Sequence, residues 1–195
     1  RPESVTLTED RADKQQTHLA LFKLPTVLLI ISFIYLPSLF GGFLFEDTRL
    51  LEQQQEVSEN SSPAVFFTQA FVLDRAGQGE QEIYRPLYAT LLWVQYQLWG
   101  KHPLGYHLSS LLLHLLSVIL LYRLLTSWLG QSKQDLCLCM SLLWGILPVH
   151  TEILCYTTAT PHLLIAPFYL GALLCYSRGI RWYHNLGFTL LSILA

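Results

Sequence analysis

The chain has 195 residues, of which 52% are apolar and only 13% are Asp, Glu, Lys or Arg, against about 25% charged residues in ordinary soluble domains. This composition excludes a disordered chain, and four Cys are too few for a disulfide scaffold. A net charge of -2 shows no electrostatic footprint for nucleic acid, so the remaining class is a membrane protein.

The first predicted element is a membrane span over Leu24–Phe45. Its 22 residues contain no charged side chain, and a helix needs about 20 apolar residues to cross hydrocarbon. A cleaved signal peptide is the alternative, but the apolar run is too long and no small-residue cleavage site follows it. Residues 1–23 are therefore expected to form an N-terminal tail, and residues 24–195 a membrane bundle.

The segment 46–102 forms a long polar loop before the next span. Within it, Tyr84–Trp99 is predicted to be a helix, because Pro86 suits a first helical turn and Gly100 a helix end. The helix is too short to span. Its many aromatic residues favour a position in the membrane interface, although an ordinary buried helix fits the pattern equally well.

Further uncharged runs predict further spans, at Pro103–Tyr122, Leu136–Thr151, Ile153–Ser177 and Trp182–Ala195. The sequence therefore predicts an all-α fold, a polytopic bundle of membrane helices. Because the chain begins at Arg1 rather than Met and stops inside an apolar run, it is expected to be a fragment of a longer protein.

The third span of the chain, Leu136–Thr151, is short, because Pro148 interrupts its apolar run. Irregular backbone at membrane depth is tolerated only where protein or a water-filled cavity surrounds it. His150 and Glu152 follow the break and are therefore expected to face a cavity.

Basic residues next to short connections predict the orientation of the bundle. If the spans alternate, these residues fall on one side of the membrane: Lys14, Lys23, Arg123, Lys133, Arg178 and Arg181. The N-terminus is then cytoplasmic. The loop 46–102, with eight acidic and four basic residues, lies on the opposite side.

Two adjacent carboxylates, Glu46 and Asp47, follow the first span directly. They can form a polar cap at the water boundary. Alternatively, one of them acts as a general base, since two close carboxylates need not ionise equally and one can accept a proton from an attacking hydroxyl. The sequence leaves both interpretations open.

His107 and His114 are seven residues apart, so on a helix they share a face with Ser110 between them. Hydrogen bonding between helices is the more common use of such residues. The functional alternative makes this face the lining of a substrate cavity.

No metal site is predicted. Cys137 and Cys139 have the wrong spacing for a zinc pair, and Cys155 and Cys175 have no matching partners, so the cysteines are interpreted as packing groups. The chain also contains no Gly-rich phosphate loop, which argues against a soluble nucleotide as a substrate.

Five short motifs occur in a fixed order: Glu46-Asp47, Tyr84-Arg85-Pro86-Leu87, Gly100-x-x-Pro103, Tyr106-His107 followed by His114, and Pro148-Val149-His150-Thr151-Glu152. In this order and on this side of the membrane, they resemble the N-terminal part of TMTC-type protein O-mannosyltransferases. These are transmembrane and tetratricopeptide-repeat proteins of the GT-C class of glycosyltransferases. The resemblance covers residues 24 to 178.

The resemblance implies an enzyme that moves mannose from a polyprenyl- or dolichyl-phosphate carrier to a hydroxyl of a protein or glycan, outside the cytoplasm. The membrane is that of the endoplasmic reticulum in a eukaryote or the inner membrane in a bacterium. Asp47 and Glu46 match the family's acidic pair, where the base is expected. Arg85 matches an arginine suited to the carrier phosphate, although it can also simply start a helix.

The other matching residues, His107, His114, His150 and Glu152, are implied to line the same cavity. The family usually has Asp at the position of Glu46, Asn at Ser110 and His at Leu147. These departures favour an alternative, a non-catalytic scaffold or pseudoenzyme of the same fold. A transporter is a third option, but no paired interrupted helices recur in corresponding halves.

Overall fold

The computed structural model describes residues 23–44, 47–48, 63–67, 71–74, 80–179, 187 and 190. The described part of the chain is helical apart from one antiparallel hairpin, which the sequence did not predict. Its strands are β1 (Phe71–Asp74) and β2 (Glu80–Ile83), with Phe71 opposite Ile83. The predicted all-α class is confirmed, with this hairpin added inside the long loop.

The N-terminal helix covers Lys23–Phe40 and ends in a 3-10 segment, η1 (Leu36–Phe40). Five α-helices follow it in the described stretch 80–179. They are α3 (Pro86–Trp99), α4 (Pro103–Leu129), α5 (Gln134–Gly145), α6 (Val149–Cys155) and α7 (Thr160–Ser177). Three further 3-10 segments are η2 (Pro63–Phe67), η3 (Gln131–Lys133) and η4 (Thr157–Ala159).

Within the described residues, three helices are long and apolar enough to cross a membrane: Lys23–Phe40, Pro103–Leu129 and Thr157–Ser177. A fourth span exists if the two pieces Gln131–Gly145 and Val149–Cys155, which meet at an angle of 60°, are counted as one broken span. The predicted interruption of this span is confirmed. The fifth predicted span lies almost entirely outside the described residues.

Two predicted boundaries are wrong. The second span was expected to end at Tyr122 before a charged residue, but the helix continues through the exposed Arg123 and stops at Gly130, whose φ is 83°. The border between the third and fourth spans was placed at Glu152, yet α6 passes through it. In both cases the charged side chain is exposed, so the charge does not oblige the helix to stop.

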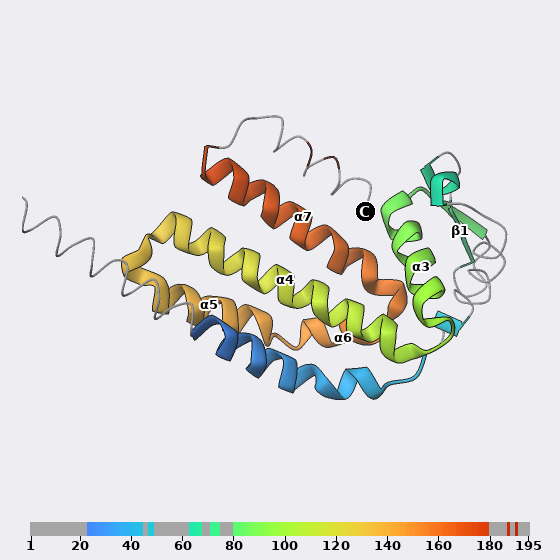
Figure 1. Cartoon of the computed structure of the whole chain (residues 1–195), viewed down its shortest axis with the longest axis horizontal. Helices are drawn as coiled ribbons and strands as arrows, with labels where there is room; N and C mark the ends of the chain where they lie inside the picture. The colour runs from blue at the N-terminus through green and yellow to red at the C-terminus, as the bar shows by residue number, and fades with distance from the viewer. Residues whose placement is uncertain are drawn as a thin grey trace, which may run out of the picture.

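The long helices lie side by side, with α3 running across one end of the bundle (Figure 1). α4 is central and packs against α7, α5, η1 and α3. At the end far from α3, Lys23 pairs with Asp135 at 2.7 Å and Ser127 hydrogen-bonds Ser177 at 2.9 Å. We call this the basic end, because Lys23, Arg123, Lys133 and Arg178 lie at the helix ends there. The opposite end is the α3 end.

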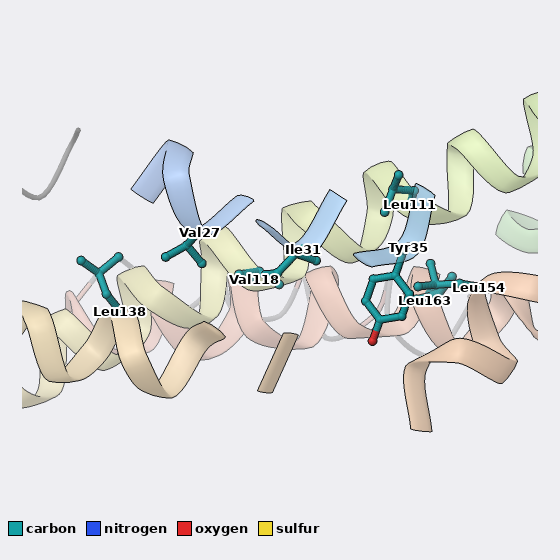
Figure 2. Close-up of a cluster of buried hydrophobic side chains, with 8 residues drawn as sticks. All are labelled: Val27, Ile31, Tyr35, Leu111, Val118, Leu138, Leu154 and Leu163. Atoms are coloured by element: carbon teal, nitrogen blue, oxygen red, sulfur yellow. The ribbon is translucent and has the colours of Figure 1, made fainter. Parts of the chain in front are cut away.

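The main apolar cluster runs along the middle of the bundle and joins the N-terminal helix to α4, α5, α6 and α7. Figure 2 shows its members: Val27, Ile31, Tyr35, Leu111, Val118, Leu138, Leu154 and Leu163. Gly145 permits this packing, because a Cβ there would lie 2.5 Å from Cδ1 of Ile31. The break after α5 is held by Tyr35, whose hydroxyl donates to the carbonyl of Leu147 at 3.0 Å.

A second apolar cluster fixes α3 to the bundle. Tyr88, Ala89 and Leu92 on α3 are buried together with Tyr106 of α4 and Leu164 of α7. The other side of α3 is exposed, including Leu98 at 65%. One face of α3 is therefore buried in the protein, and its position in the membrane interface stays a prediction.

Candidate functional site

Asp47 is completely buried at the α3 end, although it is a charged residue in a connection. Its carboxylate accepts two backbone hydrogen bonds, from the N–H of Thr157 to Oδ2 at 3.2 Å and from the N–H of Thr158 to Oδ1 at 3.0 Å. These N–H groups open the helical segment Thr157–Ser177. The first N–H groups of a helix have no partner within the helix, and they favour a negative charge. Asp47 therefore ties the segment after the first span to the start of α7.

Arg85 stands one residue before Pro86, the first residue of α3, and is half-buried. Its neighbour Tyr88 is buried on the same turn, and the Tyr88 hydroxyl lies 3.5 Å from the carbonyl of Thr157. Tyr88 thus meets the same short segment that binds Asp47.

Burial and two charged residues act on the pKa of Tyr88. Burial raises this pKa above its ordinary value of 10.0, the negative charge of Asp47 raises it further, and the positive charge of Arg85 acts in the opposite direction. Tyr88 therefore stays protonated and serves as a neutral hydrogen-bond donor between two charged residues. The predicted residues Asp47 and Arg85 therefore both lie within electrostatic range of Tyr88.

Sequence reasoning overlooked Tyr88 and the Thr157–Thr158 pair. Tyr88 had been grouped with the other aromatic residues of its helix as an interface anchor. The signal that could have singled it out is its position within the first turn after Arg85-Pro86, where it follows Arg85 around the helix.

His107 borders a cavity of about 330 Å³ at the α3 end. Its ring is only 2% exposed, and Nδ1 lies 3.2 Å from the carbonyl oxygen of Leu154. Because a carbonyl only accepts, Nδ1 carries a proton, and in the neutral imidazole Nε2 then presents a lone pair. Nε2 is buried and has no hydrogen-bond partner in the described structure.

His114 and Ser110 are buried on the same face of α4 as His107, as the spacing predicted. His114, however, belongs to a different environment. Its Nε2 hydrogen-bonds the carbonyl of Gly145 at 3.0 Å, and its ring packs edge-on against Tyr35 and stacks on Trp144, with centroid distances of 5.5 and 5.6 Å. His114 thus makes the interhelical hydrogen bond that is the more common use of such residues, and it is not among the residues that line the His107 cavity.

His150 joins this aromatic cluster. Its ring centroid lies 4.7 Å from that of His114 and 4.6 Å from that of Trp144. His150 is buried, whereas Glu152 on the same short helix is exposed. The described part of the cavity lining contains Thr151 and Cys155 from α6 but neither His150 nor Glu152. Glu46, the other predicted carboxylate, lies outside the described residues.

The Asp47 contacts and the His107 cavity are neighbours. Leu44 lines the cavity, and its carbonyl accepts the backbone N–H of Asp47 at 2.9 Å. On the other side, Cys155 lines the cavity two residues before Thr157. The carboxylate and the imidazole are thus connected through two short backbone segments.

Among the described residues, no group of three or more His, Cys, Asp or Glu side chains could hold a metal ion. The four cysteines are free thiols, with Cys137 buried, Cys139 exposed, and Cys155 and Cys175 partly buried. The chemistry available at the α3 end is that of a carboxylate, a guanidinium, a phenol and a neutral imidazole.

Comparison with known proteins supports the family resemblance. The chain is 26% identical over 194 residues to the Caenorhabditis elegans protein O-mannosyl-transferase F38B6.6, covering 95% of this chain and 27% of that protein. It is 24% identical over 159 residues to human protein O-mannosyl-transferase TMTC3, covering 81% of this chain and 17% of that protein. Similarity to Xenopus laevis tmtc2 is 27% over 150 residues, which is 74% of this chain and 17% of that protein.

The chain therefore spans about a quarter or less of the length of these curated relatives. No family model and no solved structure matches it. The predicted resemblance to TMTC proteins is confirmed at the level of sequence similarity over most of the chain.

Proposed function

We propose that this chain is part of a glycosyltransferase that moves mannose from a polyprenyl-phosphate carrier to an acceptor hydroxyl at the α3 end of the bundle. The observation that carries the proposal is that Asp47 and Tyr88, from positions far apart in the sequence, both contact the Thr157–Thr158 segment, with Arg85 one turn of α3 before Tyr88. The names of the similar proteins, which are protein O-mannosyl-transferases, support the choice of mannose and of a protein acceptor.

The proposed step is an inverting displacement at C1 of the sugar. The acceptor oxygen forms a bond to C1 while the bond from C1 to the carrier phosphate breaks, and its electron pair leaves on the phosphate. The hydroxyl proton passes to Asp47 or Glu46 as general base. Each oxygen of Asp47 accepts one N–H and keeps a further lone pair for this proton.

Arg85 has the chemistry required to stabilise the carrier phosphate as it leaves. A guanidinium is always charged and binds a phosphate with two parallel hydrogen bonds. Its half-buried position at the start of α3 lets it face a ligand while staying close to Tyr88. We assign it to the carrier phosphate, whose charge increases as the sugar departs.

The orientation of the bundle in the membrane, as indicated by its basic residues, is compatible with a lipid-linked donor. Lys23, Arg123, Lys133 and Arg178 at the basic end favour a cytoplasmic location for that end. The α3 end then lies outside the cytoplasm, at the membrane boundary. There, a carrier chain can stay in the lipid while the acceptor arrives from water.

The test is transfer of labelled mannose from dolichyl-phosphate mannose to an acceptor protein, using the full-length protein in detergent. Asp47→Asn and Glu46→Gln should each be compared with wild type, and the double variant should lose transfer. If the double variant transfers mannose at the wild-type rate, the acidic pair is not the base.

A non-catalytic scaffold is the second candidate, and one observation favours it. Asp47 is fully buried and both of its oxygens are already bound, as in a purely structural helix cap. In that case, wild-type protein would show no transfer with any lipid-linked sugar, while Asp47→Asn would still lower stability.

A further inference from the structure

The His107 cavity lies between the end of the first span and helices α4 and α6. Its volume of about 330 Å³ falls within the range of pockets that bind small molecules. The lining residues with polar side chains are Tyr35, Ser38, His107, Thr151 and Cys155, and the rest of the described lining is apolar or glycine. The Tyr35 hydroxyl is already used, because it donates to the carbonyl of Leu147. None of the described lining residues is Asp, Glu, Lys or Arg.

The hydrogen-bonding capacity of His107 limits the ligand. Its only N–H is used by Leu154, so the free Nε2 can accept a hydrogen bond but cannot donate one. A phosphate offers mainly acceptor oxygens and a negative charge, and it would find no cation here. A hydroxyl group can donate to Nε2 and accept from Thr151, so it fits both neighbours.

The backbone at Gly41 keeps the approach to Nε2 open. A Cβ at this position would lie 3.8 Å from Nε2 of His107 and 3.2 Å from the carbonyl oxygen of Ser38. The conformation of Gly41, with φ of -65° and ψ of 149°, is open to any residue. The absence of a side chain therefore matters for space and not for backbone strain.

We propose that the cavity is a hydroxyl-binding subsite, separate from the phosphate site at Arg85, in which a ligand hydroxyl donates to Nε2 of His107. The proposal rests on the proposed function in one respect, because Leu44 and Cys155 place the cavity beside Asp47. The hydroxyl belongs either to the sugar or to a Ser or Thr acceptor, and the experiment distinguishes these sources.

Cys155 provides a direct readout, because it lines the cavity and is partly buried. The full-length protein in detergent is labelled with a small methanethiosulfonate reagent, and the rate at Cys155 is followed by peptide mass spectrometry. Three probes are compared: methyl α-mannoside, a Ser/Thr-containing peptide and inorganic phosphate. Cys139 is the internal control, since it lines the cavity at the basic end.

One hydroxyl probe is expected to slow labelling of Cys155 several-fold, and the probe that does so identifies the source of the hydroxyl. Phosphate should have no effect, and Cys139 should label at the same rate throughout. Protection by phosphate, or by neither hydroxyl probe, would overturn the proposal.

Two matched histidine variants distinguish loss of the hydrogen bond to the ligand from a general structural effect of replacing a buried histidine. His107→Asn places an amide N–H where Nδ1–H was and so retains a donor for Leu154, but it removes the acceptor in the cavity. His114→Gln likewise retains a donor for Gly145 and removes a free ring nitrogen outside the cavity. The probe concentration that half-protects Cys155 should rise about tenfold in His107→Asn, as expected for one hydrogen bond, and stay unchanged in His114→Gln.

Equal protection in His107→Asn and wild type would contradict the role of Nε2. Gly41→Ala gives a second check, because its methyl group narrows the approach to Nε2 and should also weaken protection. None of these readouts requires transfer. If a hydroxyl probe protects Cys155 as expected but the protein transfers no mannose, the hydroxyl-binding subsite is supported and the proposed function is contradicted.

Discussion

The two ends of the bundle contain cavities of nearly equal size but opposite chemistry. The cavity at the basic end, about 340 Å³, is apolar except near Lys23 and Asp135, which form an ion pair with side chains that are 44% and 70% exposed. At the α3 end, three polar or charged residues are buried: Asp47, His107 and Thr157 are all at most 2% exposed. An exposed charge stays solvated and costs little free energy. A buried charge loses its hydration and is costly unless it has hydrogen-bond partners or a function. The buried polar residues therefore favour the α3 end, and not the basic end, as the location of a functional site.

The largest expected effect on stability is at Asp47. Asp47→Ala removes the acceptor of two buried N–H groups, those of Thr157 and Thr158. Each orphaned donor costs about 1–3 kcal/mol, so the free energy of unfolding should fall by about 2 kcal/mol or more. Denaturant unfolding in detergent measures this, and a change below about 0.5 kcal/mol would show that these hydrogen bonds do not hold α7 in place.

Gly145→Ala should have the next largest effect. Its methyl group would lie 2.5 Å from Cδ1 of Ile31 and 3.2 Å from Cγ2 of Val118, and overpacking of this kind costs about 1–3 kcal/mol. Gly42→Ala is the matched control, because a Cβ there meets nothing within 4 Å. Thermal unfolding should distinguish the two variants, and equal midpoints would mean that the first span does not pack closely on α5.

A smaller effect is expected at Tyr88. Tyr88→Phe keeps the buried ring but removes a hydroxyl whose contact with the carbonyl of Thr157 is long, at 3.5 Å. The loss in unfolding free energy should be about 0.5–1 kcal/mol, well below that of Asp47→Ala. If Tyr88→Phe were the more damaging variant, the hydroxyl and not the carboxylate would organise the α3 end.

The smallest effect is expected at the basic end. Asp135→Ala breaks the ion pair with Lys23, but both side chains are substantially exposed, and such pairs contribute about 0–1 kcal/mol. Raising the salt concentration should reduce even this difference. A loss as large as that of Asp47→Ala would remove the contrast between the two ends.

Much of the fold could be predicted from the sequence because apolar runs and proline are strong local signals. The spans, the short helix after Arg85 and the break at Pro148 all follow from these signals. Helix ends next to Arg123 and Glu152 could not be predicted from charge, since an exposed charged side chain is compatible with a continuing helix. The hairpin β1–β2 lies in a polar segment without a clear alternation of apolar residues.

The site was less accessible to sequence reasoning because it depends on tertiary partners. His107 and His114 have the same residue type, helix and face, yet one reaches a cavity and the other an aromatic cluster. Only the positions of α5, α6 and the end of the first span decide this. The capping of Thr157 and Thr158 by Asp47 likewise joins residues 110 or more apart, and no local pattern indicates it.

The most direct test of the account compares one arginine from each end of the bundle. Arg85→Lys and Arg123→Lys both keep a positive charge, but only Arg85 is placed at the carrier phosphate. In the transfer assay with dolichyl-phosphate mannose, Arg85→Lys should lower the rate about tenfold or more, because a lysine cannot form the two parallel hydrogen bonds to phosphate. Arg123→Lys should leave the rate unchanged. Equal rates in both variants and wild type would contradict the assignment of the donor site to the α3 end.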